Sequence, residues 1–278
     1  MNFMKRFPSH YSYRHAFHFF SYLYHNIQDS IYSYRQFSGL QKIIRNRMLA
    51  TYFQPIINLQ DESCLGYEAL NRPPSSMLFP STESFYDFIG HTDQVFEFER
   101  FCREVSIERY HTTVMLEKKT KDTVIFLNVH PRVLLDSSYR SGETICLLQR
   151  YGLCPEQVVF ELTEKQAVHD YVEFERILSH YRSQGFRIAI DDAGSGYNSL
   201  KAIVSLKPDF IKLDRSLIRH IDTQPDQQQL IKILKQYTAG SNTSIIAEGI
   251  ERLEEIGFLR NEGIEYGQGY ALGRPVQS

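Results

Sequence analysis

The sequence predicts a (β/α)8 barrel, a modified TIM barrel in which one strand runs antiparallel to its neighbours. Eight short apolar segments alternate with helical patterns along most of the chain, which is typical of this architecture. Only residues 60–63 separate the first two segments. A helical crossover needs a longer connection, so these two segments should form an antiparallel hairpin. An open doubly wound sheet is the alternative.

The individual elements follow from the spacing of apolar residues between polar, Gly and Pro breaks. Strands are expected at residues 52–58, 64–70, 123–129, 158–162, 188–190, 210–213, 244–247 and 266–270. Helices are expected at residues 85–89, 95–110, 143–151, 169–184, 197–206, 226–240 and 253–261.

Residues 1–38 form a helical, basic and aromatic-rich extension that differs from the barrel region at 39–278. Helical spacing of apolar residues predicts an amphipathic helix over residues 15–34, and Gly39 separates it from a second short helix over 40–48. We expect the first helix to pack on the barrel. A contact with a protein partner or a second copy, and association with a membrane surface, are the alternatives.

Composition excludes several classes of protein. The formal net charge is −2. The first 50 residues hold seven Lys or Arg against one acid, so the remainder is acidic and does not predict a nucleic-acid polymer as partner. The four cysteines lack Cys-x-x-Cys spacing, which favours reduced thiols in a cytoplasmic protein. No apolar run is long enough to span a bilayer, and no secretory leader is recognisable.

Polar residues stand at the carboxyl ends of the expected strands, where barrels of this type carry their chemistry. They are Glu68, Asn128, Glu161, Asp191, Asp192, Lys212, Asp214, Glu248 and Gln268. The adjacent Asp191 and Asp192 would repel each other and lose hydration, and a divalent cation offsets both costs. A turn in which one Asp caps the next helix is the alternative.

This set of side chains predicts a particular chemistry. Carboxylates, amides and one lysine, without Cys or His, favour Mg²⁺, Mn²⁺ or Ca²⁺ over zinc. Two ions would suit in-line attack on a phosphodiester. Arg72 could then clamp a phosphate, or it could be a solvated loop residue. An enolase-type proton abstractor with Lys212 as base is an alternative, whereas a glycosidase needs two acids and no ion.

Short motifs occur in a fixed order from about residue 40 to the C-terminus. They are FQPI at 53–56, YEALNRP at 67–73, FLNV at 126–129, FELTE at 160–164, IDD at 190–192, PDFIKLD at 208–214, AEGIE at 247–251, GQGY at 267–270 and GRP at 273–275. This ordered set resembles the EAL-domain cyclic di-GMP phosphodiesterases. The chain departs from the family at Ala193, where Phe is usual, and at Pro73, where an aromatic residue is common.

The resemblance implies hydrolysis of cyclic di-GMP to linear pGpG with two Mg²⁺ or Mn²⁺ ions, with Ca²⁺ inhibitory. It also implies a homodimer formed through the barrel. The cysteines favour a cytoplasmic location, and the basic, aromatic extension allows association with the membrane surface. The alternative is a weak or inactive cyclic di-GMP receptor or scaffold, the route taken by relatives with degenerate sites.

The matching motifs also imply residue roles. One ion would be held by Glu68, Asn128, Glu161 and Asp191, and the second by Asp191, Asp192 and Gln268. Lys212 would orient the attacking water, and Glu248 would act as general base or water-mediated metal partner. Substrate contacts would come from Gln54, Arg72, Asp214 and Glu251. Glu164 would steady the loop after Asp192.

Overall fold

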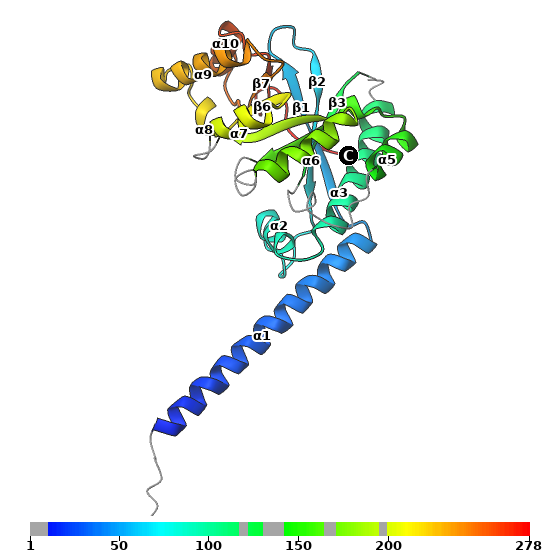
Figure 1. Ribbon diagram of the computed structural model, residues 1–278, viewed down its shortest axis with the longest axis vertical. Coiled ribbons are helices and arrows are strands. Elements are labelled where there is room, and N and C mark those ends of the chain that lie inside the picture. Colours follow the sequence, from blue (N-terminus) through cyan, green and yellow to red (C-terminus); the bar gives the residue numbers. More distant parts are fainter. Residues whose placement is uncertain (1–10, 117–121, 130–141, 164–170, 195–198) are drawn as a thin grey trace, which may run out of the picture.

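The computed structural model describes residues 11–116, 122–129, 142–163, 171–194 and 199–278 (Figure 1). Its strands form one sheet in the order β2-β3-β4-β5-β6-β7-β8-β1-β9, and a further pairing between β2 and β1 closes the barrel. The closure confirms the barrel and excludes the open doubly wound sheet.

The strand β1 runs antiparallel to both of its barrel neighbours. It spans Ala50–Asn58 and pairs with β2, Cys64–Arg72, in the expected hairpin, and with β8, Tyr266–Gly267. The other strands run parallel to β2: β3 Val124–Asn128, β4 Val158–Thr163, β5 Arg187–Ala193, β6 Phe210–Leu213 and β7 Ser244–Ala247. A short β9, Val276–Gln277, adds to β1.

Helices cover the outside of the barrel and connect its strands (Figure 1). They are α2 Thr82–Gly90, α3 Val95–Arg109, α5 Glu143–Tyr151, α6 Tyr171–Ser183, α7 Ser199–Leu206, α8 Arg215–Ile218, α9 Pro225–Thr238 and α10 Leu253–Asn261. A π-helical segment, Tyr110–Leu116, extends α3, and a 3-10 turn, Pro155–Gln157, precedes β4. The expected helices therefore form, with ends shifted by a few residues.

Alternation along the strands separates two apolar layers. One face of each parallel strand packs beneath the helices in the main core, which includes Ile125, Phe160, Ile188 and Ile211. The other face contributes to a separate buried cluster formed by Ile56, Val124, Phe126, Val159, Ala189, Phe210 and Ile246. Successive strand side chains point to opposite faces, so this second cluster fills the barrel interior.

The N-terminal helix differs from the sequence prediction. A single helix, α1, runs continuously over Tyr11–Arg45, so Gly39 does not end it. A Cβ at Gly39 would lie 3.4 Å from side-chain atoms of both Leu78 and Phe79, an ordinary packing distance, so the helix contacts the loop before α2 at this position. Among the described residues, no helix is both long and apolar enough to cross a membrane.

The expected packing of the first helix on the barrel is wrong for most of its length. Leu40 and Ile43, near its C-terminal end, are buried in a cluster with side chains of α2 and α3 such as Phe85 and Phe98. The preceding turns leave the barrel and project away from it (Figure 1). Phe20, among other apolar residues there, is 67% exposed.

Candidate active site

A ring of polar residues lies next to the apolar barrel interior, toward the carboxyl ends of the strands. On each of five strands, or directly after it, a polar residue stands two positions after an inward apolar residue: Phe126 precedes Asn128, Val159 precedes Glu161, Ala189 precedes Asp191, Phe210 precedes Lys212, and Ile246 precedes Glu248, which follows β7. Residues two apart on a strand share a face, so the ring points into the barrel mouth. Glu68 of β2 and Gln268, just past β8, join it through the hydrogen bond from Gln268 Nε2 to Glu68 Oε2 at 2.7 Å.

Lys212 lies at the centre of the ring, with its side chain 1% exposed. Its Nζ is 2.6 Å from Glu161 Oε1 and 2.9 Å from Glu248 Oε1. The same nitrogen is 3.1 Å from Asp191 Oδ1 and 3.5 Å from Glu68 Oε2. The barrel therefore brings four predicted acids around one ammonium group.

Burial and mutual repulsion shift the proton equilibria of this cluster. Burial, together with the nearby Asp191 and Glu68, raises the pKa of Glu248 to about 8, although Lys212 opposes the shift. Burial also raises the pKa of Glu161 well above its usual value. Burial disfavours the charged form of Lys212, but the surrounding carboxylates outweigh it and raise its pKa. The cluster thus carries more carboxyl groups than its single ammonium can neutralise.

Some buried oxygens of the ring lack hydrogen bonds. Among the described residues, Glu161 Oε2 and Gln268 Oε1 have no hydrogen-bond partner. Unsatisfied buried oxygens are costly, and a divalent cation that prefers oxygen ligands would satisfy them. The donor set therefore fits Mg²⁺, Mn²⁺ or Ca²⁺.

The backbone at the end of β5 explains how two adjacent aspartates reach one site. Neighbours on a regular strand point to opposite faces. The β5–β6 register shifts between Ile190 and Ala193, and Asp192 has a positive φ of 55°. This irregularity turns the chain, and carboxylate oxygens of Asp191, Asp192 and Glu248 lie within 4.8 Å of one another. The three acids could hold a metal ion together.

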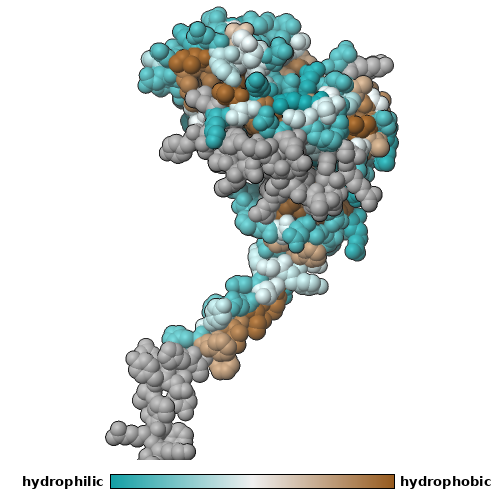
Figure 2. All heavy atoms as spheres, viewed as in Figure 1, coloured by the Kyte–Doolittle hydropathy of each residue, from teal (hydrophilic) through white to brown (hydrophobic). Residues whose placement is uncertain are grey.

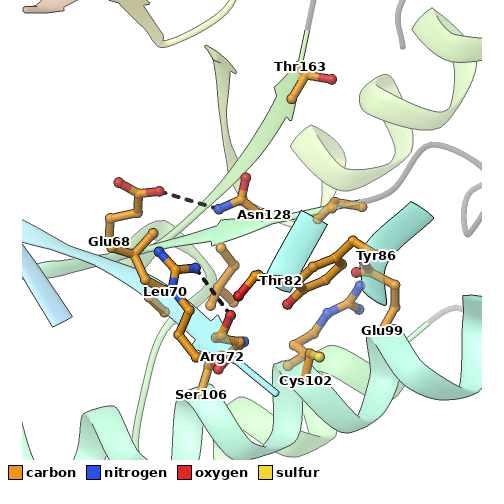
Figure 3. A pocket seen from close by; sticks show the side chains of 15 residues that line it. Glu68, Leu70, Arg72, Thr82, Tyr86, Glu99, Cys102, Ser106, Asn128 and Thr163 are labelled. Carbon is orange, nitrogen blue, oxygen red and sulfur yellow. Dashed lines mark hydrogen bonds between the residues drawn. The ribbon is translucent and has the colours of Figure 1, made fainter. Parts of the chain in front are cut away.

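Two cavities flank Glu68, which lines both. One, of about 290 Å³, is lined by Gln54, Asp192, Asp214, Glu248, Glu251 and Gln268 among others. The other, of about 400 Å³, is lined by Glu68, Arg72, Tyr86, Glu99, Asn128 and Thr163 among others (Figure 3). Glu68 is therefore the predicted metal ligand that both hollows share, whereas Asn128 lines the larger hollow and Asp192 and Gln268 line the smaller one.

The residues expected to contact substrate have local partners. Gln54 Nε2 donates to Gly273 O at 3.2 Å, and Arg72 donates to the backbone of Asn71 (Figure 3). Asp214 accepts from Ser216 N at 2.9 Å as the N-cap of α8, and Glu251 pairs with Arg215 at 3.0 Å. Each of the four expected side chains also lines one of the two cavities.

Glu164, expected to steady the loop after Asp192, lies outside the described residues. Tyr86 of α2 and Glu99 of α3 line the larger cavity. No motif includes them, and the spacing of apolar residues in these two segments predicts only helices that cover the outside of the barrel. Ala193 is buried within the main core, 1% exposed.

Fold and site together define a closed barrel whose mouth carries an acidic cluster suited to divalent cations. The chain matches the EAL domain family over residues 38–275, so it belongs to that family.

Similar proteins carry related descriptions. The probable cyclic di-GMP phosphodiesterase PdeB of Escherichia coli is 29% identical over 247 residues, which cover 85% of this chain and 44% of PdeB. The cyclic di-GMP phosphodiesterase PdeR of the same species is 27% identical, over 86% of this chain and 36% of PdeR. The chain therefore spans less than half the length of these relatives.

Solved structures share the fold. The EAL enzyme Bd1971, with cAMP and cyclic di-GMP bound, aligns with a TM-score of 0.78 and 26% identity over 90% of this chain and 68% of its own. BlrP1 of Klebsiella pneumoniae, in complex with manganese and cyclic di-GMP, aligns with a TM-score of 0.73 and 26% identity over 83% of this chain and 56% of its own.

Proposed function

We propose that this protein is a divalent-metal-dependent phosphodiesterase that hydrolyses cyclic di-GMP to linear pGpG. The observation that carries the proposal is the convergence of Glu68, Glu161, Asp191 and Glu248 around Lys212, with buried oxygens left unsatisfied. The names of the relatives and the cyclic di-GMP complexes of similar structures support this substrate.

The cation site would be formed by Glu68, Asn128, Glu161, Asp191, Asp192 and Gln268. Bound Mg²⁺ or Mn²⁺, as two ions, would supply charge to the phosphate and an activated water. Ca²⁺ would occupy the site without supporting turnover.

The remaining groups divide the work of proton transfer and binding. Lys212 and Glu248, whose side-chain nitrogen and oxygen are 2.9 Å apart, would orient the water that attacks phosphorus. Glu248 would accept a proton from that water as the water oxygen bonds to phosphorus, the P–O bond to the ribose oxygen would break, and the released ribose oxygen would take up a proton from solvent. Arg72 would contact a phosphate, while Gln54, Asp214 and Glu251 would contact the nucleotide from the smaller cavity.

The direct test is incubation with cyclic di-GMP and Mn²⁺ or Mg²⁺, followed by chromatography of the products. We expect linear pGpG from the parent chain and none from Glu68→Ala, which removes a metal ligand. Glu97→Ala is the matched control, because Glu97 is an exposed glutamate on α3 outside the site. Turnover by Glu68→Ala at the parent rate would contradict the assignment of Glu68.

A receptor without turnover is the second candidate. Ala193 favours it, because the family usually carries Phe directly after the paired aspartates and this chain lacks that aromatic ring. Binding of cyclic di-GMP to the parent chain without pGpG formation would support the receptor and reject the phosphodiesterase.

The same proposal includes a division of the chain at residue 38, a homodimer formed through the barrel and a cytoplasmic location. The family match that starts at residue 38 supports the first. The cysteines support the last, because those in the described part of the chain form no disulfide.

A further inference from the structure

The exposed part of α1 carries a regular apolar stripe. Its members are Phe20, Tyr24, Ile27, Ile31 and Tyr34, each between 46% and 70% exposed. They are spaced by alternating steps of four and three residues, which is the seam of a coiled coil. Figure 2 shows apolar residues gathered along one side of this part of the helix.

The stripe cannot be covered by the barrel of its own chain. Residues nine apart on a helix lie two and a half turns apart, and hence on opposite faces. Ile31 is nine residues from the buried Leu40, and Tyr34 is nine from the buried Ile43. The side of α1 that contacts the barrel is therefore the side opposite the stripe.

A polar contact places the same side of the helix against the barrel. Gln36, nine residues from Ile27, donates its Nε2 to Leu78 O at 3.2 Å. The docked end thus fixes the rotation of α1 and turns the stripe outward.

Charge favours a helix over a lipid surface as the occupant. Lys5, Arg6 and Arg14 precede the stripe, and between residues 18 and 37, along the stripe itself, the acidic and basic side chains, histidines aside, are only Asp29 and Arg35. An interfacial helix that binds anionic lipid carries several Lys or Arg on its polar face. A second copy of α1 meets no like charge along the stripe.

The area is sufficient for a pair of helices. Aromatic side chains can each bury 150–250 Å². At the observed exposures, five stripe residues from each of two copies would bury on the order of 1,000 Å² in total, which reaches the minimum expected of a specific interface. A stripe that repeats every seven residues is also self-complementary, as a two-fold interface requires.

We propose that α1 pairs with α1 of a second copy along this stripe, as a two-stranded coiled coil that holds two barrels together. The contact lies outside the barrel and is independent of the chemistry of the site. Ile27 stands at the middle of the stripe, so the two copies of Ile27 lie near each other whether the helices run parallel or antiparallel.

Disulfide cross-linking tests this pairing in the full chain. The background carries Cys146→Ser and Cys154→Ser, because both thiols are exposed. We expect Ile27→Cys to form a covalent dimer under mild oxidation. His25→Cys, an exposed position outside the stripe, is the matched control and should remain monomeric on denaturing gels.

A second substitution separates pairing along α1 from pairing through the barrel. Added to Ile27→Cys, Ile31→Glu should abolish the cross-link, and Ser33→Glu, on another face, should leave it intact. Cross-linking of Ile27→Cys no greater than that of His25→Cys would overturn the proposal. A second result would also overturn it. In that result, light scattering shows that the parent chain and Ile27→Glu/Ile31→Glu are both monomers, and only the parent chain sediments with anionic phospholipid vesicles.

Discussion

Lys212 is the residue on which the site depends electrostatically. A buried ammonium is costly unless it is paired, and here four carboxylates approach it. The acids in turn exceed the single positive charge, so their ionisation in the absence of metal is opposed by burial and repulsion. The arrangement is stable without metal only where some carboxyls keep their protons.

Glu248 therefore predicts a pH dependence of stability in the metal-free chain. Its pKa in the fold, about 8, exceeds its usual value of 4.5, so between these values the folded state binds more protons than the unfolded state. The contribution of the Glu248 proton to the free energy of unfolding should be fully present below about pH 4.5 and should fall as pH rises toward 8. Its limiting slope is about 1.4 kcal/mol per pH unit for one proton.

Urea unfolding in the presence of chelator, at several pH values from mildly acidic to mildly alkaline, measures this slope. Glu248→Gln removes the titrating group, so its free energy of unfolding should decline less over the same interval. Equal slopes for the two proteins would show that Glu248 does not hold its proton in the fold.

At the scale of elements, the close contact between β2 and β3 depends on Gly66. A Cβ at this position would lie 2.1 Å from the backbone oxygen of Val124, so an added side chain would force the two strands to move apart. Glu68 follows Gly66 by two residues on β2, and Glu68 pairs in register with Phe126 of β3. The glycine therefore helps to hold Glu68 near Asn128.

Gly66→Ala should destabilise the chain by about 1–3 kcal/mol, the usual cost of overpacking, and should weaken metal binding by displacing Glu68. Gly257→Ala is the matched control, because Gly257 lies within α10 and a Cβ added there would meet no atom within 4 Å. The control should raise stability by roughly 0.5–1 kcal/mol.

Chemical denaturation and calorimetric titration with Mn²⁺ measure both effects. An unchanged midpoint for Gly66→Ala would mean that β2 and β3 can separate freely.

At the scale of the whole molecule, α1 belongs partly to the barrel and partly to its surroundings. Leu40 and Ile43 complete the cluster that supports α2 and α3, and these helices supply Tyr86 and Glu99 to the wall of the larger cavity. The exposed turns before residue 36 add nothing to that cluster. The barrel should therefore tolerate loss of the turns before residue 39 but not of Leu40 and Ile43.

Truncation tests this division. A chain that begins at residue 39 keeps Leu40 and Ile43 and should unfold cooperatively at nearly the temperature of the full chain. A chain that begins at Met48 loses both side chains and should be destabilised by several kcal/mol, since each large apolar residue removed from a core costs about 2–5 kcal/mol.

Circular dichroism melts at matched concentration provide the comparison. Insoluble or unfolded protein from the first truncation would show that the exposed turns are part of the core after all.

Much of the candidate site could be predicted from the chain because strands impose local order. A strand that closes a barrel places its last inward residue at the mouth, so the polar residue after each apolar run could be assigned without coordinates, as for Glu161 and Asp191. The type of side chain then predicted oxygen ligands for a cation. The antiparallel first strand followed from a connection too short for a crossover.

Other features depend on contacts between distant segments. The turn at Asp192, the four carboxylates around Lys212 and the cavity wall from Tyr86 and Glu99 arise only when separate strands and helices meet. Apolar periodicity predicted which face of α1 is apolar, but it did not predict what packs against that face.

The sequence by itself determined the barrel, the strand ends and the oxygen-rich chemistry, because periodicity and residue type are local properties. Only the tertiary structure decided the direction of α1, since burial of Leu40 and Ile43 fixes which face of the helix turns outward. It also decided the proton equilibria of Glu248 and Lys212, because distance and burial between remote residues are properties of the closed barrel.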